Sequence, residues 1–148
     1  MIKKQLQRIS QLSKSYQSSL YVVGGTLRDI ILGQECADFD FTVRGASTLA
    51  KEYAHNTKSA LVPLDTTPGR ETFRVVIKKN LYFDFSELQG DSIEMDLSQR
   101  DFTINAMAIS LQNFIKDSKD FIDPHNGKHD IEQKTIRVLP GPIFLSDP

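Results

Sequence analysis

The sequence has a single cysteine, Cys36, which excludes an intramolecular disulfide framework. A lone thiol fits a protein of a reducing compartment, and no motif around Cys36 supports a catalytic role for it. No stretch approaches the ~18 apolar residues that a membrane span needs. Residues 1–16 carry Lys and Arg but lack the apolar segment of a signal peptide. We therefore expect a soluble, cytoplasmic protein.

An excess of one charge is also missing, because 18 Lys and Arg stand against 19 Asp and Glu, for a net charge of −1. A protein that binds nucleic acid through its bulk charge would be clearly basic. Any such role must therefore be local, or supplied by other parts of the protein. Low-complexity tracts and obvious internal repeats are lacking too. The length of 148 residues indicates one domain with a real hydrophobic core.

The spacing of apolar residues predicts helices and strands that alternate along the chain. Helices are expected over residues 2–12, 26–33 and 47–56, the last with Ser47 as N-cap, and strands over residues 20–23, 38–43 and 60–64. Residues 71–88 predict a hairpin that turns near Lys79 and Asn80. Residues 92–111 predict a helix followed by a strand, and residues 121–139 predict a turn at 124–127, a short helix and a last strand. Because a hairpin argues against an all-parallel sheet, we predict an α+β domain: a mixed β-sheet with helices mainly on one face.

Two acidic residues in "DFDF", Asp38 and Asp40, alternate with core-like phenylalanines. Residues i and i+2 of a strand point to the same side, so the two carboxylates project in parallel. Such a pair repels itself unless a cation lies between. Mg²⁺ suits the pair, since it takes one or two carboxylates and completes its shell with water and phosphate oxygens. A solvated strand face that carries two acids is the alternative.

Two adjacent glycines, Gly24 and Gly25, end the first strand, and Arg28 follows in the first turn of the next helix. Glycine allows the backbone to turn tightly and to approach a ligand closely. The N–H groups at a helix start can bind an anion, and an arginine can fork onto a phosphate. The alternative is an ordinary strand–helix turn with a surface arginine.

A third polar stretch, "QRDFTINAMA", places Arg100 and Asp101 just before core-like residues. A local salt bridge or helix cap would explain this pair equally well. Asn105, followed by the small Ala106 and Ala108, can be explained by tight packing.

Taken in order, "GGTLRD", "DFDF" and "QRDFTINAMA" resemble the catalytic head domain of class II CCA-adding tRNA nucleotidyltransferases and bacterial poly(A) polymerases. That group belongs to the DNA polymerase beta nucleotidyltransferase superfamily. "ETFRVV" and "FIDPHNGKHDIEQKTIRVL" are similar to later segments of the same domain. The resemblance thus covers almost the whole chain from Leu20 onward, and it implies the nucleotidyltransferase (polymerase beta-like) head fold.

The resemblance also implies a role for each matching residue. The two catalytic, metal-holding carboxylates are Asp38 and Asp40. The nucleotide-binding residues are Gly24, Gly25, Arg28 and Arg100, and the supporting residues are Asp29 and Asp101. A third acid often completes such sites, and Asp84 on the neighbouring strand is the first candidate, with Asp101 second. Arg74 is either a further contact or a surface arginine.

The implied activity is a template-independent transfer of CMP or AMP from CTP or ATP to an RNA 3′ end by a two-metal mechanism with Mg²⁺. The CCA end of tRNA is the favoured substrate. A poly(A) polymerase head domain is the alternative, as is a non-catalytic nucleotide- or RNA-binding module on the same fold. A purely structural interaction domain would leave "GGTLRD" and "DFDF" without a reason.

The sequence departs from the family pattern at two places. Gln99 stands where the family usually has the first of two arginines, so one phosphate contact is missing or replaced. The chain reaches "FLSDP" where the family continues into a helical neck, body and tail. We therefore expect residues 1–148 to be the N-terminal head of a longer protein whose absent helical parts hold most of the RNA. The oligomeric state is left open.

Overall fold

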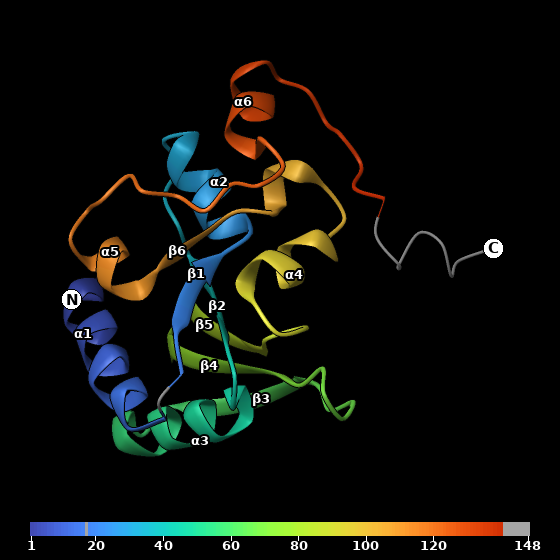
Figure 1. The fold of residues 1–148 in the computed structure, drawn as a ribbon. Coiled ribbons are helices and arrows are strands. Elements are labelled where there is room, and N and C mark those ends of the chain that lie inside the picture. Colours follow the sequence, from blue (N-terminus) through green and yellow to red (C-terminus); the bar gives the residue numbers. More distant parts are fainter. Residues whose placement is uncertain (17, 141–148) are drawn as a thin grey trace.

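A six-stranded mixed sheet forms the centre of the computed structural model, which describes residues 1–16 and 18–140 (Figure 1). The strands are β1 (Leu20–Val23), β2 (Asp38–Val43), β3 (Ala60–Asp65), β4 (Thr72–Lys78), β5 (Leu81–Glu87) and β6 (Ala108–Ser110). Their order across the sheet is β3-β4-β5-β2-β1-β6. The pair β2–β5 is parallel and all other pairs are antiparallel. The predicted α+β fold with a mixed sheet is confirmed.

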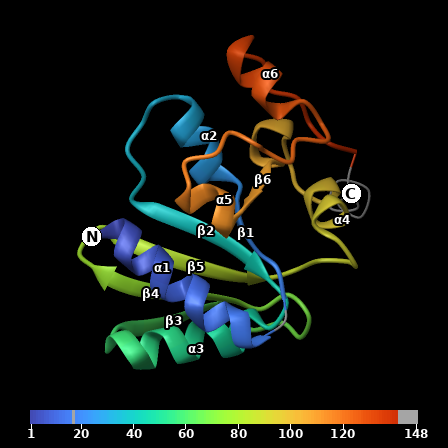
Figure 2. The ribbon, with the colours of Figure 1, turned by 60° about the vertical axis from the view of Figure 1, so that its left-hand side comes forward.

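The helices are α1 (Ile2–Ser13), α2 (Gly25–Ile31), α3 (Ala46–Thr57), α4 (Ile93–Ser98), α5 (Leu111–Ile115) and α6 (Gly127–Glu132). Two 3₁₀ turns are also present: η1 (Lys14–Tyr16) follows α1, and η2 (Thr103–Asn105) lies between α4 and β6. In Figure 1, α1 and α5 lie to the left of β1, and α4 lies to its right. Figure 2 shows α1 passing in front of the strands and ending near α3. None of the helices within residues 1–16 and 18–140 is long and apolar enough to cross a membrane.

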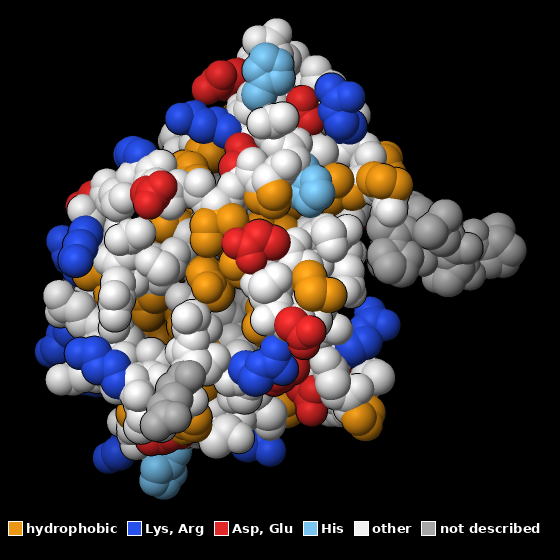
Figure 3. Space-filling model, in the orientation of Figure 1, with side chains coloured by type: hydrophobic (Ala, Val, Ile, Leu, Met, Phe, Trp, Pro, Cys, Tyr) orange, Lys and Arg blue, Asp and Glu red, His pale blue; other side chains and the backbone are white. Residues whose placement is uncertain are grey.

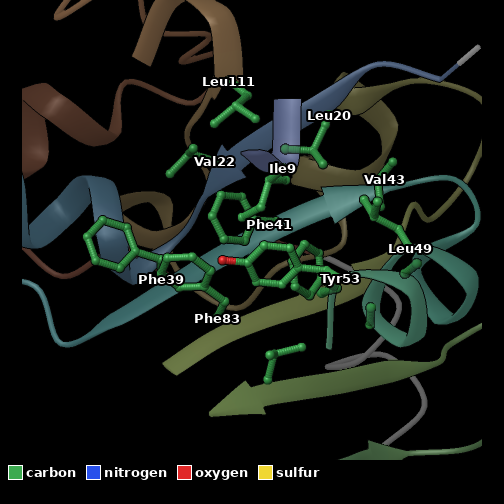
Figure 4. Packing of buried hydrophobic residues seen from close by; sticks show 14 of the residues in the cluster. Ile9, Leu20, Val22, Phe39, Phe41, Val43, Leu49, Tyr53, Phe83 and Leu111 are labelled. Atoms are coloured by element: carbon green, nitrogen blue, oxygen red, sulfur yellow. The ribbon is translucent and has the colours of Figure 1, made fainter. Parts of the chain in front are cut away.

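The main core lies between one sheet face and the helices α1 and α3 (Figure 4). Alternation along β2 and β5 sends their phenylalanines to this face, where Phe41 stacks on Phe85 with ring centroids 5.2 Å apart. Tyr53 of α3 lies over Phe83 at 6.0 Å, and its hydroxyl donates to Gln5 of α1. The same alternation that buries these rings turns Asp38 and Asp40 to the other face.

A smaller core lies on that other face, mainly over β1 and β6. It joins Val23 and Ala108 of the sheet to Leu97 of α4 and to Ala106, which follows η2. The prediction of helices mainly on one face therefore holds, with α4 as the exception. The opposite face is covered beside β1 and β6, and the acidic residues of β2 and β5 lie next to the covered part.

Two local predictions were wrong. Ser47 is not the N-cap of α3, because the helix begins at Ala46 with Gly45 as its cap residue. The predicted last strand within residues 121–139 is only an isolated bridge between Val138 and Phe102. Its backbone is held instead by single hydrogen bonds to the segment around η2, as in the donation from Leu139 N to Asp101 O. Residues 141–148 lie outside the described part.

The start of α3 is capped from a distant strand. The carboxylate of Glu87, at the end of β5, accepts hydrogen bonds from Gly45 N and Ala46 N at 3.0 Å. We expect Glu87→Ala to lower the free energy of unfolding by about 1–2 kcal/mol, because two N–H groups lose their acceptor and the helix loses an anion at its N-terminus. Urea denaturation measures this change. Glu87→Gln keeps an acceptor oxygen and should lose less; equal losses in both variants would contradict the capping role.

Candidate active site

Three carboxylates lie on one face of the sheet, on two neighbouring strands. In the parallel pair β2–β5, Asp40 lies directly beside Asp84, and Asp38 lies beside Tyr82. Residues paired in this way point to the same face, so the prediction of Asp84 as the acid next to the pair agrees with the register. Asp38 is exposed, Asp40 is half-buried and Asp84 is buried. The catalytic roles of the three residues stay a prediction.

The carboxylate of Asp40 lies near two other carboxylates, which repel it. Burial raises the pKa of Asp40 to about 6, and the neighbouring carboxylates of Asp84 and Asp38 add to this rise, while Arg100 and Arg74 oppose it. The side chain of Asp40 makes no hydrogen bond to any of residues 1–16 or 18–140. A cation bound here would therefore relieve a real electrostatic cost.

Asp84 already has a cationic partner, Arg74 of β4. Arg74 Nε and Nη2 donate to the two carboxylate oxygens of Asp84 at 2.9 and 3.0 Å. The guanidinium also lies over the ring of Tyr82, 4.7 Å from its centroid. The hydrogen bonds to Asp84 raise the pKa of Arg74. Arg74 is thus part of the acidic site rather than a free surface arginine.

Gly24 brings the backbone close to both an acid and an arginine. Its φ of 65° and ψ of −135° lie in a region that residues with a side chain rarely adopt. A Cβ placed on Gly24 would lie 3.3 Å from Nη1 of Arg100 and 3.8 Å from Oδ2 of Asp40. The glycine bend, Arg100 and Asp40 therefore lie close together.

Arg100 is held in this place by Asp96, a residue that lies outside the sequence motifs. Nε and Nη2 of Arg100 donate to Oδ1 of Asp96 at 3.2 and 3.0 Å, and Nη2 also reaches the hydroxyl of Thr42 at 3.3 Å. Asp96 is 4 % exposed, and its other oxygen accepts from Gln89 N. The i, i+4 spacing of Asp96 and Arg100 around the end of α4 was the available sequence signal.

Arg28 is positioned by two side chains. Its Nε donates to Asp29 at 3.1 Å, and its Nη1 donates to Oδ1 of Asn105 at 2.9 Å. Asn105 donates in turn to Asp101 at 3.4 Å. The contact of Asp29 with Arg28 agrees with the supporting role expected for Asp29. Asn105 is more than a packing residue, and a polar amide among apolar neighbours was the signal for it.

Asp101 is exposed. It belongs to the hydrogen-bonded series Arg28–Asn105–Asp101 and does not lie with Asp38, Asp40 and Asp84 on the sheet. Its Oδ1 accepts from Phe102 N at 2.8 Å and from Asn105. It therefore fits the supporting role. For the third acid, the register of the strands favours Asp84 over Asp101.

The donor set of Asp38 and Asp40 suits Mg²⁺. Both are hard oxygen ligands on one face, and their mutual repulsion is what a divalent cation would remove. Among residues 1–16 and 18–140, no three His, Cys, Asp or Glu side chains gather as a ready metal centre.

The thiol of Cys36 is not activated. Burial, with Asp29 and Asp40 nearby, raises the pKa of Cys36, so the reactive thiolate is disfavoured. This agrees with the absence of a catalytic motif around it.

Comparison with known proteins identifies the family. Residues 20–137 match the model of the poly A polymerase head domain. The chain belongs to this family. The family prediction made from the three motifs is confirmed.

Relatives and solved structures agree with this assignment. The head domain is 36 % identical over 142 residues to a CC-adding tRNA nucleotidyltransferase of Geobacter sulfurreducens, covering 95 % of the chain and 31 % of the relative. It is 38 % identical over 143 residues to an A-adding tRNA nucleotidyltransferase of Aquifex aeolicus, covering 86 % of the chain and 17 % of the relative. A structure of a CCA-adding enzyme with ATP superposes with a TM-score of 0.82 at 33 % identity, covering 99 % of the chain and 34 % of that protein. The chain spans about a third of the length of these proteins, or less.

The segment that contains α6 packs against η2 and fixes its position through Asp130. Asp130, only 2 % exposed, accepts hydrogen bonds from the hydroxyl of Thr103 at 2.6 Å and from Arg137 at 3.2 Å. These bonds lower the pKa of Asp130. Since Thr103 opens η2, the segment fixes the turn that carries Asn105.

The surface of the head domain agrees with its balanced composition. On the face shown in Figure 3, acidic and basic side chains are interspersed. This face therefore carries no broad basic surface of the kind that binds nucleic acid through bulk charge.

Proposed function

We propose that this chain is the catalytic head of a longer RNA nucleotidyltransferase, which adds CMP or AMP from CTP or ATP to RNA 3′ ends. The observation that carries the proposal is the juxtaposition of Asp38, Asp40 and Asp84 with the Gly24 bend and Arg100. A structural or purely binding module would have no need to hold three mutually repelling carboxylates beside the bend at Gly24.

Each residue has a task in this reaction. Gly24 and Gly25 let the backbone approach the triphosphate, and Arg28 and Arg100 neutralise its charge. Asp29, Asn105 and Asp96 hold the two arginines in place, so that little reorganisation is needed when substrate arrives. Mg²⁺ bound by Asp38 and Asp40 would lower the pKa of the attacking hydroxyl and neutralise the leaving pyrophosphate. Asp84, which lies beside Asp40, would add negative charge to the same site.

The relatives support a tRNA substrate over a general poly(A) tail. The relatives from Geobacter sulfurreducens and Aquifex aeolicus are a CC-adding and an A-adding tRNA nucleotidyltransferase. Similar structures are described as a tRNA-processing enzyme with CTP, and as a tRNA nucleotidyltransferase with a primer tRNA and an ATP analogue. We extend these substrates to this chain, together with a cytoplasmic location and a helical remainder that grips the RNA.

The test is the incorporation of labelled CTP or ATP into a tRNA that lacks its CCA end, with the full-length protein. We expect incorporation that needs Mg²⁺ and that disappears with EDTA. The double substitution Asp38→Ala with Asp40→Ala should abolish it, while Asp91→Ala, on an exposed loop, should not. Incorporation that survives the double substitution would remove the assignment of these carboxylates; wild-type protein without incorporation into any RNA end would overturn the proposed function.

A further inference from the structure

The acid face of the sheet is divided into a covered and an open part. On one side of Asp38 and Asp40, α4 and η2 cover β1 and β6. On the other side lie β5, β4 and β3, and the helix packed against these strands among the described residues is α3, on the opposite face. The carboxylates therefore lie at the border, with one open flank of sheet beside them.

The strand register defines which residues line this open flank. Arg74 lies beside Asp84, and Val62 of the edge strand β3 lies beside Arg74. Tyr82 lies beside Asp38, with Val76 next to it. Val62 is 40 % exposed, and the side chain of Arg74 is 32 % exposed. Val62 and Val76 thus place apolar side chains beside Arg74 and Tyr82, while the hydroxyls of Thr72 and Ser86 continue the same face beyond Asp84.

The half-buried side chain of Arg74 is held in one orientation by its neighbours. Its fork is bound to both oxygens of Asp84, and one plane of its guanidinium lies on the ring of Tyr82. The guanidinium of this half-buried side chain is thus a flat cation held in place from two sides. Arginine planes and aromatic rings are the groups on which proteins stack unpaired nucleic-acid bases.

The in-line geometry of phosphoryl transfer indicates which of the two substrates lies on this flank. The attacking and leaving oxygens lie roughly in line on opposite sides of the transferred phosphorus. The bend at Gly24, Arg28 and Arg100 lies on the β1 side of the acids and suits the triphosphate. The acceptor must then approach from the β5 side.

We propose that Arg74, supported by Tyr82, is the platform on which the 3′-terminal base of the acceptor RNA stacks. This inference rests on the proposed function and adds to it the place of the second substrate. Val62 and Val76 form the apolar border of the platform. Because stacking needs only a flat face, the platform accepts any base, and it positions the terminal hydroxyl without selecting sequence.

The test separates stacking from charge in the full-length protein. Arg74→Lys keeps the positive charge beside Asp84 but loses the plane, and we expect the KM for a tRNA acceptor to rise about tenfold, with the KM for CTP changed by less than about twofold. Tyr82→Leu should act in the same direction. Tyr82→Phe keeps the ring, so it should raise the KM for the acceptor less than Tyr82→Leu does. Arg70→Lys repeats the exchange on an exposed loop and should behave as wild type.

An acceptor whose terminal nucleotide has no base gives the decisive comparison. Wild type should use it about tenfold less well than the intact acceptor, whereas Arg74→Lys should use the two equally. If Arg74→Lys lowers kcat alike on both acceptors, Arg74 only holds Asp84 and the platform is refuted. If Val62→Ser leaves the KM for the RNA acceptor unchanged, Val62 does not border the acceptor base, which also contradicts the platform. A wild-type protein with no incorporation at all would refute the proposed function, a separate result.

Discussion

Replacing Asp40 by asparagine is expected to abolish nucleotide transfer and, at the same time, to stabilise the unliganded domain at neutral pH. Activity should fall on the order of 10³-fold, because one of the two carboxylates placed to hold Mg²⁺ is lost. Stability should rise because the pKa of Asp40 in the folded protein is about 6, so ionising it there costs free energy. Asn has nearly the same shape, and no hydrogen bond to the described side chains is lost.

The pH dependence of this gain has a definite sign. The pKa of Asp40 is higher in the folded chain, about 6, than its ordinary value of 3.8. The contribution of Asp40 to the free energy of unfolding therefore falls as pH rises from about 4 through about 6. Asn does not titrate, so the variant does not show this fall. Asp40→Asn should exceed wild type by about 1–3 kcal/mol near pH 8 and equal it near pH 4.

Urea denaturation at the two pH values, with and without Mg²⁺, measures both effects. Mg²⁺ should stabilise wild type and leave Asp40→Asn unchanged near pH 8. Asp38→Asn is the matched control: its exposed side chain is solvated, so we expect a similar loss of activity with little change in stability. If Asp40→Asn is less stable than wild type near pH 8, the described repulsion among the acids is wrong.

Among the substitutions proposed for this chain, Gly127→Ala is expected to lower the free energy of unfolding the most. A Cβ on Gly127 would lie 2.2 Å from the carbonyl oxygen of Thr103 and 3.2 Å from Met107. A backbone atom cannot move aside as a flexible side chain can, so α6 must shift away from η2. We expect the free energy of unfolding to fall by about 3 kcal/mol, as in other overpacked sites.

The same change should reach the candidate active site, because η2 carries Asn105, the partner of Arg28. In urea denaturation, Lys128→Ala, on the exposed side of the same helix, serves as the control and should unfold at the wild-type midpoint. The KM for CTP of the full-length Gly127→Ala protein should rise, as Arg28 loses its support. An unchanged midpoint for Gly127→Ala would mean that α6 does not pack on η2 as described.

Local patterns in the sequence were sufficient for the elements with strong periodicity. The alternation in "DFDFTV" placed the phenylalanines in the core and Asp38 and Asp40 together on the other face, since a strand offers no other arrangement. The glycine pair between a strand and a helix indicated a close backbone approach, and Gly24 has that conformation. The family, too, followed from motifs in their order.

Predictions that depended on a distant partner were wrong or incomplete. Ser47 looked like a helix cap, yet Glu87 of β5 fills that place, and nothing near residue 46 in the sequence reveals it. Residues 135–139 have the composition of a strand, but a strand also needs a partner edge, and here the neighbour is the loop around η2. Asn105 and Asp96 gained their roles only from the arginines that they meet.

By itself, the sequence determined the family, the fold class and which side of β2 carries the acids, because periodicity and motif order are local properties of a chain. Only the tertiary structure decided that Asp84 lies beside Asp40 and is held by Arg74, that Arg100 lies against Gly24, and that one flank of the acid face stays open. These relations join residues far apart in the chain, and the order of strands in the sheet fixes them. No local pattern encodes that order.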